Sequence, residues 1–479
     1  MKKSILIVFT LFITNSHLWS QQVVSSTFLT SYDLSYFVNE LEITFSQYGV
    51  DLYRVNYTTT NLEGALDTAS GLLCIPQLEG FYLPMVSYGH GTVGSRFAVP
   101  SYLSDEHLLP AIYSSMGTVC VAPDYLGLGD NEGIHPYVHA DSEASASYDL
   151  MVAAESYLAD EMDIPLNDQL FITGYSQGGH SAMALHRYIE QETSTVVTGS
   201  FPMSGPYSIS SGMKDLLVSE EEYGYVAYLA STAISYQEVY GTIYPNNDIT
   251  QFFKQPYADI ILKFQNEEAD LFDVNQELID SLIVLEGGAF PKKMIFDDIV
   301  EAILTDDNHP VNIALRDNDV YDWAPQADTR LLYCMADDQV TFENSIIARD
   351  KMIENGAPLV TAFDLNPNFN HTECVEPAAT NFVIYLLLVA NPTTSTLDQR
   401  QVSFTVAPNP NHGSFRISTS TIEGIFTADF YSIHGALEKR ISSVRSNDVI
   451  DVDLDTGLYL VHLKDGDGNI LGVQKIIIE

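Results

Sequence analysis

The chain has 479 residues, with 64 Asp and Glu against 21 Lys and Arg, and its formal net charge is -43 at pH 7. A field of this sign repels nucleic acid and anionic membrane surfaces, so we expect no nucleic-acid partner. With 46% hydrophobic and 18% charged residues, the composition is typical of a folded protein, and the length predicts more than one domain.

The first twenty residues have the pattern of a secretory signal peptide. Lys2 and Lys3 precede an apolar run over residues 5–13, and Ser20 is the expected cleavage site. The apolar run is about half a membrane span, which argues against a membrane anchor. We therefore expect residues 1–20 to be removed and the mature chain to be secreted or attached to the cell surface.

Strand-like runs then alternate with helical runs, which predicts an α/β fold with a mainly parallel central sheet. The expected strands cover residues 69–75, 83–88, 118–122, 170–173, 197–202, 330–336 and 359–363. The expected helices cover residues 144–159, 181–186, 342–355 and 377–389. Residues 21–61 are interpreted as an entry segment with a helical stretch near 36–48. The whole α/β domain is expected to cover residues 21–390.

The alternation stops between residues 207 and 327, where aromatic residues are frequent. An insertion of this size, placed between two strands of the sheet, is where a cap over an active site is found. The plainer interpretation is a helical subdomain with an aromatic core. The two interpretations are compatible, because a cap needs a core of its own.

The end of the chain has a different pattern. Residues 391–401 form an expected linker, and residues 402–479 contain short alternating runs separated by Gly, Asn and Asp turns. This pattern predicts a small all-β sandwich.

A Gly-x-Ser-x-Gly pattern lies between the strand over 170–173 and the following helix. It is formed by Gly174, Ser176 and Gly178. In a nucleophile elbow, a tight strained turn lifts the serine hydroxyl toward substrate, and glycines keep the crossing of strand and helix open. A serine in an ordinary turn is the alternative, but the strand before and the helix after favour the elbow.

A nucleophilic serine needs a histidine base, and the histidine needs a carboxylate to fix its tautomer. In chain order the partners should be Ser, acid and His. His371 follows the last strand and fits this order, whereas His309 precedes the next strand and does not. Asp337, at the end of the strand over 330–336, is the expected acid, with its neighbour Asp338 as the alternative.

A tetrahedral intermediate also needs two amide donors for its oxyanion. We expect the backbone of Gln177 to supply one and the backbone of Thr92 the other, with Gly91 as the alternative to Thr92. His90 is interpreted as an exposed loop residue without a role in proton transfer. The turn over 124–129 is expected to shape the pocket wall.

The four cysteines fall into two pairs. Cys74 and Cys120 lie inside strand-like runs and are expected to be buried free thiols. Cys334 and Cys374 each lie three residues from an expected catalytic residue, so a disulfide between them would brace the site. Spacing alone leaves this pairing open.

These residues resemble two known families. Residues 174–179 and 123–129, with the contexts of Asp337 and His371, are similar to the α/β-hydrolase superfamily, and more narrowly to the secretory lipase family of triacylglycerol lipases and esterases. That family carries a large helical cap at the position of 207–327. The tail resembles the type A sorting domain of the type IX secretion system, through residues 407–413, 457–461 and 474–478.

The expected function is hydrolysis of a small-molecule or lipid ester through an acyl-enzyme on Ser176. This chemistry implies no cofactor, and we assign no metal ligands. The tail implies handling by the type IX secretion machinery and export across both membranes of a Gram-negative cell. The alternatives are a secreted peptidase or amidase with the same triad, and a non-catalytic binding protein displayed on the cell surface.

Overall fold

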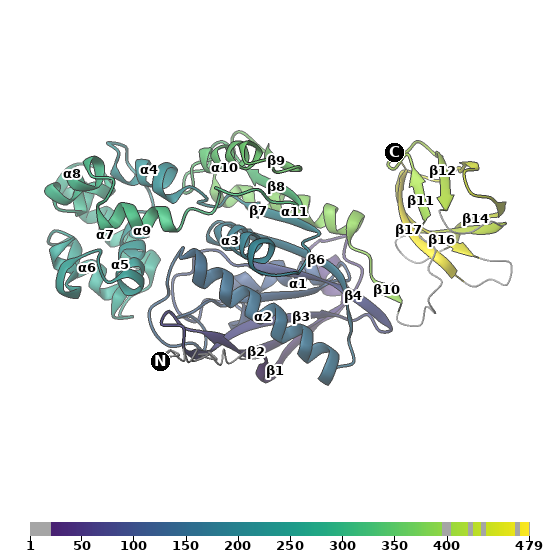
Figure 1. The fold of residues 1–479 in the computed structure, drawn as a ribbon, viewed down its shortest axis with the longest axis horizontal. Coiled ribbons are helices and arrows are strands. Elements are labelled where there is room, and N and C mark those ends of the chain that lie inside the picture. The colour runs from purple at the N-terminus through teal and green to yellow at the C-terminus, as the bar shows by residue number, and fades with distance from the viewer. Residues whose placement is uncertain (1–20, 395–403, 420–424, 433–436, 465–469, 479) are drawn as a thin grey trace, which may run out of the picture.

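The computed structural model describes residues 21–394, 404–419, 425–432, 437–464 and 470–478. The expected signal peptide and most of the expected linker lie outside the described residues. The described chain forms a large sheet flanked by helices, a group of further helices beside it, and two small sheets near the C-terminus (Figure 1).

Nine strands of the large sheet follow the order β1-β2-β3-β5-β4-β6-β7-β8-β9, and β10 pairs with β4. Neighbouring strands from β5 to β9 are parallel, whereas β1, β2 and β3 are antiparallel to their neighbours. The predicted α/β fold with a mainly parallel sheet is therefore confirmed. The strands are β1 (Val23–Tyr32), β2 (Val50–Thr60), β3 (Leu66–Pro76), β4 (Phe81–Gly89), β5 (Val119–Pro123), β6 (Leu166–Tyr175), β7 (Gly199–Met203), β8 (Asp328–Tyr333), β9 (Val360–Asp364) and β10 (Thr393–Thr394).

The prediction for residues 21–61 was wrong, because this segment contributes β1 and β2 to the sheet. The expected helix near 36–48 is reduced to a five-residue helical turn, Tyr36–Glu40. β1 lies at one edge of the sheet and is half exposed along its whole length. It contains many Ser and Thr residues, which suit this exposed position. A polar edge strand lacks the apolar alternation that identifies a half-buried strand.

Helices cover both faces of the sheet, and β6 shows how its side chains are divided between them. Phe171 packs with α1 and α11 on one face, while Leu170 and Ile172 pack with α2 and α3 on the other. This alternation follows from the two-residue period of a strand. These helices are α1 (Leu108–Ser114), α2 (Ala140–Glu161), α3 (Gln177–Glu192), α10 (Glu343–Glu354) and α11 (His371–Val389).

Helix α11 is the one helix of the described residues that is long and apolar enough to span a membrane. Its Ala378, Phe382 and Leu386 are fully buried in the core beneath the sheet. These contacts are those of the buried core helix that the sequence predicts.

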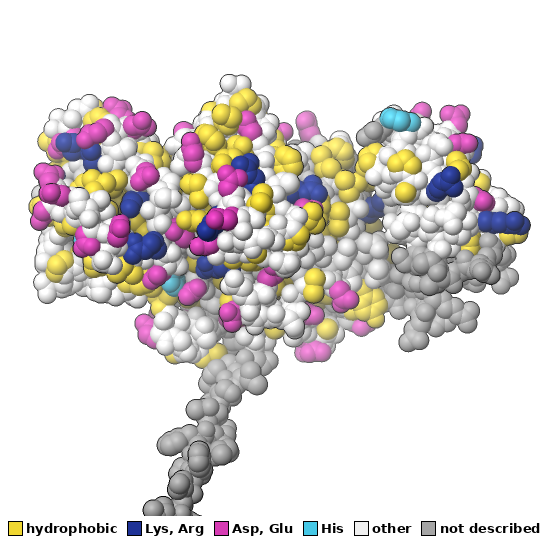
Figure 2. Space-filling model, turned by 45° about the horizontal axis from the view of Figure 1, so that its top comes forward, with side chains coloured by type: hydrophobic (Ala, Val, Ile, Leu, Met, Phe, Trp, Pro, Cys, Tyr) yellow, Lys and Arg dark blue, Asp and Glu magenta, His cyan; other side chains and the backbone are white. Residues whose placement is uncertain are grey.

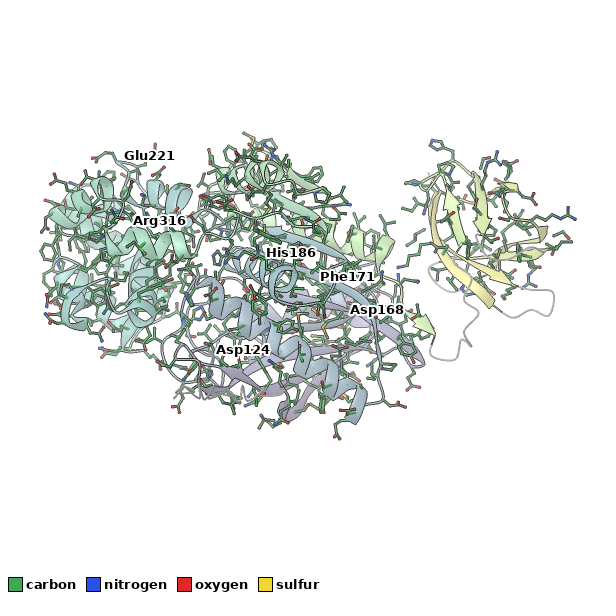
Figure 3. All side chains as sticks on the ribbon, viewed as in Figure 1. Asp124, Asp168, Phe171, His186, Glu221 and Arg316 are labelled. Carbon is green, nitrogen blue, oxygen red and sulfur yellow. A yellow bond between two sulfur atoms is a disulfide. The ribbon has the colours of Figure 1, made fainter. Side chains whose placement is uncertain are left out.

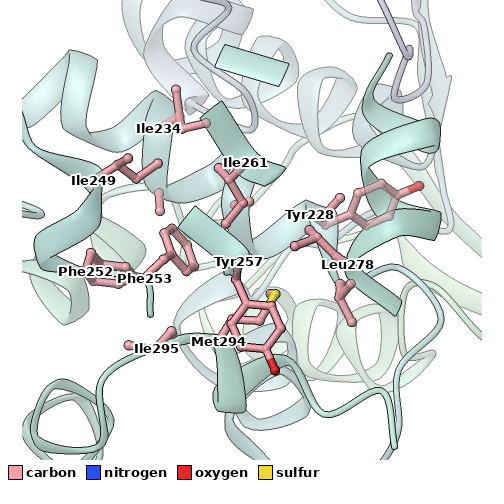
Figure 4. Close-up of a cluster of buried hydrophobic side chains, with 14 of the residues drawn as sticks. Tyr228, Ile234, Ile249, Phe252, Phe253, Tyr257, Ile261, Leu278, Met294 and Ile295 are labelled. Atoms are coloured by element: carbon pink, nitrogen blue, oxygen red, sulfur yellow. The ribbon is translucent and has the colours of Figure 1, made fainter. Parts of the chain in front are cut away.

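Between β7 and β8 the chain leaves the sheet and forms helices, which lie together at one end of the sheet (Figure 1). They have their own apolar core, in which Phe253, Tyr257, Ile261, Leu278 and Met294 are buried (Figure 4). This helical cap is the insertion expected within residues 207–327. It contains α4 (Lys214–Val218), α5 (Ala227–Tyr240), α6 (Tyr257–Gln265), α7 (Leu271–Glu286), α8 (Asp297–Thr305) and α9 (Pro310–Asp317).

The described part of the tail consists of two antiparallel sheets. One has the order β11-β12-β15 and the other β14-β13-β16-β17, and Phe415, Phe430, Val461 and Ile476 are buried in a common core. This arrangement is the small all-β domain that the sequence predicts. Its strands are β11 (Phe404–Ala407), β12 (Ser414–Thr419), β13 (Phe426–Ser432), β14 (Leu437–Val444), β15 (Val449–Asp451), β16 (Gly457–Lys464) and β17 (Ile470–Ile478).

Acidic side chains are spread over the described surface. On the face drawn in Figure 2 they are distributed over the cap and the central domain and do not gather in one patch. On this face, the excess of acidic side chains is therefore not confined to one site.

Candidate active site

The turn between β6 and α3 has the geometry of a nucleophile elbow. β6 ends at Tyr175, α3 begins at Gln177, and Ser176 between them has φ 60° and ψ -122°. A positive φ is strained for a residue with a side chain, and such strain persists only where the surroundings enforce it. Here the Ser176 amide donates a hydrogen bond to the carbonyl of Met203, at 2.9 Å, which ties the turn to the end of β7.

Glycine is required on both sides of this turn. A Cβ added at Gly174 would lie 2.1 Å from the carbonyl oxygen of Gly178, and one added at Gly178 would lie 1.9 Å from that of Gly89. Both distances are far below van der Waals contact with backbone atoms, which cannot move aside. The crossing at Gly174 and Gly178 therefore leaves no room for a side chain.

His371 is the first residue of α11, so this helix begins before the expected start at residue 377. Asn370 caps this helix, because its side chain accepts from the Glu373 amide while the Glu373 side chain accepts from the Asn370 amide. The spacing Asn-x-x-Glu is the signature of such a capping box and could have placed the helix start correctly. The cap fixes the backbone of His371, which is buried.

Asp337 and His371 are hydrogen-bonded side chain to side chain. His371 Nδ1 lies 2.7 Å from Asp337 Oδ2, and both side chains are almost fully buried. Asp337 Oδ1 accepts from the amides of Gln339 and Val340, at 3.0 and 2.9 Å, which fixes the carboxylate. The neighbouring Asp338 instead accepts from the backbone amide of His371, at 3.2 Å.

The ring of His371 lies beside the elbow. Its centroid is 4.9 Å from that of Tyr175, the residue before Ser176, and the Tyr175 hydroxyl donates to the carbonyl of His371, at 2.5 Å. Within the described chain the Ser176 hydroxyl makes no hydrogen bond to this ring. Hydrogen bonds between a nucleophile and its base are often long without substrate and shorten when substrate binds.

His309, the histidine that chain order excludes, lies in the cap. Its Nδ1 accepts from the amide of Val311, so it caps helix α9.

A disulfide joins Cys334 to Cys374, with a Cα–Cα distance of 6.0 Å. It connects the residue after β8 to the first turn of α11, the two segments that carry Asp337 and His371. The pairing that the sequence left open is thus present. Cys74 and Cys120 are free and buried, as predicted, and face each other across β3 and β5.

Two backbone amides near the elbow are available as donors. Within the described chain, the amides of Thr92 and Gln177 donate no hydrogen bond, whereas the amide of Gly91 donates to Glu106 Oε2, at 3.3 Å. The prediction that His90 is an exposed loop residue was wrong. This residue is fully buried. Its ring nitrogens bond to the carbonyls of Gly91 and Asp124, so it connects its own loop to the turn after β5.

The side chain of Gln177 is held by two buried groups that the sequence did not suggest. Its Nε2 donates to Glu143 Oε1, at 2.9 Å, and to His135 Nε2, at 2.8 Å. Burial lowers the pKa of His135 to about 4, so its ring is neutral and Nε2 can accept. Glu143 also bonds to His180 Nδ1, at 2.7 Å. These contacts join distant segments, and no local pattern indicates them.

Asp124 lies directly after β5 (Figure 3). It is fully buried and accepts from the hydroxyls of Ser70 and Ser101 and from the Ser101 amide. Burial raises the pKa of Asp124, while these hydrogen bonds act in the opposite direction. The same turn supplies Gly127 and Leu128 to the wall of a cavity, as expected for residues 124–129.

A cavity of about 400 Å³ lies between the central domain and the cap. Thr92, Gln177 and Leu128 line it from the central domain, and Ile234, Phe264 and Leu271 line it from the cap. Ser176 and His371 are not among its lining residues, so the cavity adjoins the elbow through Gln177. Its mainly apolar wall suits an apolar part of a small molecule.

Solved structures of other proteins have a similar fold. The rice cell wall degrading esterase LipA from Xanthomonas oryzae is 28% identical, with a TM-score of 0.65 over 76% of this chain and 97% of that one. Lipase A from Candida antarctica is 14% identical, with a TM-score of 0.54 over 73% of this chain and 77% of that one, a likeness of fold alone. The first domain has the α/β-hydrolase fold.

The tail is identified separately. Residues 405–479 match the secretion system C-terminal sorting domain, the tail that directs export by the type IX secretion system. No curated protein matches the chain. The hydrolase domain is thus followed by a sorting domain.

Proposed function

We propose that this protein is an exported serine hydrolase that cleaves carboxylic esters, with Ser176, His371 and Asp337 as its catalytic triad. The observation that carries the proposal is the buried hydrogen bond of 2.7 Å between His371 and Asp337, beside the strained turn at Ser176. The esterase activity named for the similar structure from Xanthomonas oryzae supports the choice of ester as the scissile bond.

In the proposed reaction, Ser176 Oγ attacks the ester carbonyl and transfers its proton to His371 Nε2. Asp337 keeps the proton of the ring on Nδ1 and stabilises the imidazolium that forms. The intermediate collapses, the ester bond breaks, and the alcohol leaves with the proton from His371. A water molecule, deprotonated by His371, then attacks the acyl-enzyme and releases the acid and Ser176.

The oxyanion of each tetrahedral intermediate accepts from the amides of Gln177 and Thr92. Both amides lack another partner in the described chain, whereas that of Gly91 is engaged by Glu106, so Thr92 is the better second donor. The N-terminus of α3 adds its dipole at the same point. Glu143 and His135 hold the Gln177 side chain and so fix this start of the helix.

The test compares the purified wild-type protein with Ser176→Ala on p-nitrophenyl esters of increasing acyl length. Ser200→Ala is the matched control, because the Ser200 hydroxyl on β7 is buried without a hydrogen-bond partner and its removal leaves no donor or acceptor unpaired. We expect turnover to vanish in Ser176→Ala and to persist in Ser200→Ala. Cleavage of aminoacyl arylamides without cleavage of any ester would instead identify a peptidase, and equal turnover in both variants would refute the role of Ser176.

A further inference from the structure

Arg96 connects the loop that carries Thr92 to a neighbouring loop of the central domain. Its guanidinium donates to the carbonyls of Gly127 and Gly133, each at 2.8 Å, and also to that of Asn131. In return, the Gly129 amide donates to the Arg96 carbonyl, at 2.9 Å. The four contacts bind Arg96 to residues 127–133, and both segments line the cavity.

The same guanidinium also reaches the cap. Arg96 Nε lies 3.0 Å from Glu267 Oε1, in the turn between α6 and α7. Two positions earlier, the carbonyl of Gly94 accepts from the Leu271 amide, at 2.9 Å. A Cβ at Gly94 would lie 2.1 Å from Asp270 Oδ2, so the loop and the start of α7 are in direct contact.

We propose that Arg96 is a positioning residue of the reaction, which holds the Thr92 amide in place by tying its loop to residues 127–133 and to the cap. This inference rests on the proposed function, because it acts through the second oxyanion donor. In this proposal the Arg96 side chain connects three walls of the cavity. These are the loop of Thr92, the turn after β5, and the turn between α6 and α7.

The chemistry of the guanidinium explains why the residue is arginine. Its planar fork offers five donors in fixed directions, whereas a lysine ammonium is a compact charge on a flexible stem. The Arg96 side chain is 19% exposed and that of Glu267 is 64% exposed, so their ion pair alone contributes little. The contacts with the backbone carbonyls should therefore dominate, and Glu267 should contribute a smaller share.

The kinetic test uses the full mature chain and p-nitrophenyl acetate, whose acyl group is too short to need the cap. We expect Arg96→Gln and Arg96→Lys each to lower kcat about tenfold with KM within twofold, because complete removal of an oxyanion donor costs roughly 10²- to 10³-fold. Glu267→Ala should lower kcat two- to threefold. The control, Glu277→Ala, breaks the Lys263–Glu277 pair of 2.6 Å elsewhere in the cap and should leave kcat unchanged.

A rise in KM without a fall in kcat would overturn the proposal, since Arg96 would then only shape the cavity. Full rescue by lysine would overturn it as well, because charge alone would suffice.

Hydrogen exchange of the amides in residues 91–97 gives a second readout that does not depend on turnover. We expect faster exchange in Arg96→Gln than in the wild type, and no change in Glu277→Ala; unchanged exchange in Arg96→Gln would refute the anchoring. If the wild type cleaved no ester, the proposed function would fail and the catalytic role of Arg96 with it. The exchange result would still show whether Arg96 orders this loop.

Discussion

At the scale of single residues, Ser176 has a strained backbone and lies between the end of a strand and the start of a helix. Its φ of 60° is imposed by the close crossing of β6 and α3, which Gly174 and Gly178 permit. The cost of this strain is of order 1–3 kcal/mol and is met by the packing of the sheet. A strained serine at a tight turn from strand to helix is what a nucleophile elbow requires.

The two adjacent carboxylates make different contacts, which leads to a test of the acid. Asp337 bonds to the ring of His371, whereas Asp338 bonds to its backbone amide. We expect Asp337→Asn to lower kcat about 10⁴-fold, because the amide favours the wrong tautomer of the base. Asp338→Asn should lower it less than tenfold. Steady-state kinetics with one ester would check both, and the reverse order of damage would show that Asp338 is the acid.

The residues that we propose as catalytic were suggested by the sequence, whereas their supporting residues were not. Ser176 is indicated by its local pattern and His371 by chain order, and the end of a strand indicates Asp337, with Asp338 as the alternative. Glu143, His135 and Arg96 act through contacts with segments up to 171 positions away. Such contacts depend on how the whole chain folds, so no spacing in the sequence reveals them.

At the scale of elements, the start of α11 and the end of β8 form one braced unit. The capping box at Asn370 fixes the first turn of α11, and the disulfide between Cys334 and Cys374 ties this turn to the segment after β8. Each cysteine lies three residues from Asp337 or His371. The bridge therefore limits the relative movement of the acid and the base.

Removal of this bridge should weaken both stability and turnover. The cysteines are 40 positions apart, and a loop of this length corresponds to about 4 kcal/mol in the chain-entropy model. We expect a Cys334→Ser, Cys374→Ser double variant to unfold at lower denaturant concentration and to lose part of its kcat. A reductant should do the same to the wild type and nothing more to the double variant. Equal stability with and without the bridge would contradict this expectation.

The elements of the sheet were predictable to different degrees. The C-terminal parts of β6 and β8 are buried, and they appear in the sequence as short apolar runs. Neither β1 nor β2 was predicted. β1 was missed because it is an edge strand that is half exposed and rich in Ser and Thr. The length of β2 and its pairing with β3 come from the folded sheet rather than from its own residues.

At the scale of the whole molecule, the chain combines a catalytic domain, its cap and a sorting domain. The cap has an apolar core of its own, and the sorting domain has another. Among the described residues, Lys475 Nζ donates to the carbonyl of Ala390 at 2.6 Å, a contact between the tail and the end of α11. Burial lowers the pKa of Lys475 to about 8.

Because the tail has its own core, we expect the hydrolase domain to fold and to keep its activity without the tail. We expect a chain of residues 21–394 to fold and to keep kcat/KM within twofold of the full mature chain, because no catalytic residue lies beyond it. A chain of residues 21–390 is the matched comparison, since it also lacks β10, which pairs with β4. Thermal unfolding and ester kinetics would check both. Loss of turnover in the longer chain would contradict the predicted domain boundary.

The central claim is that His371 activates Ser176, and covalent labelling tests it most directly. The protein would be treated with a fluorophosphonate, and the modified peptide would be located by mass spectrometry in the wild type and in His371→Ala. The account predicts a single adduct on Ser176, formed at least a hundredfold more slowly in the variant. An adduct on another residue, no adduct, or an equal rate in both proteins would contradict it.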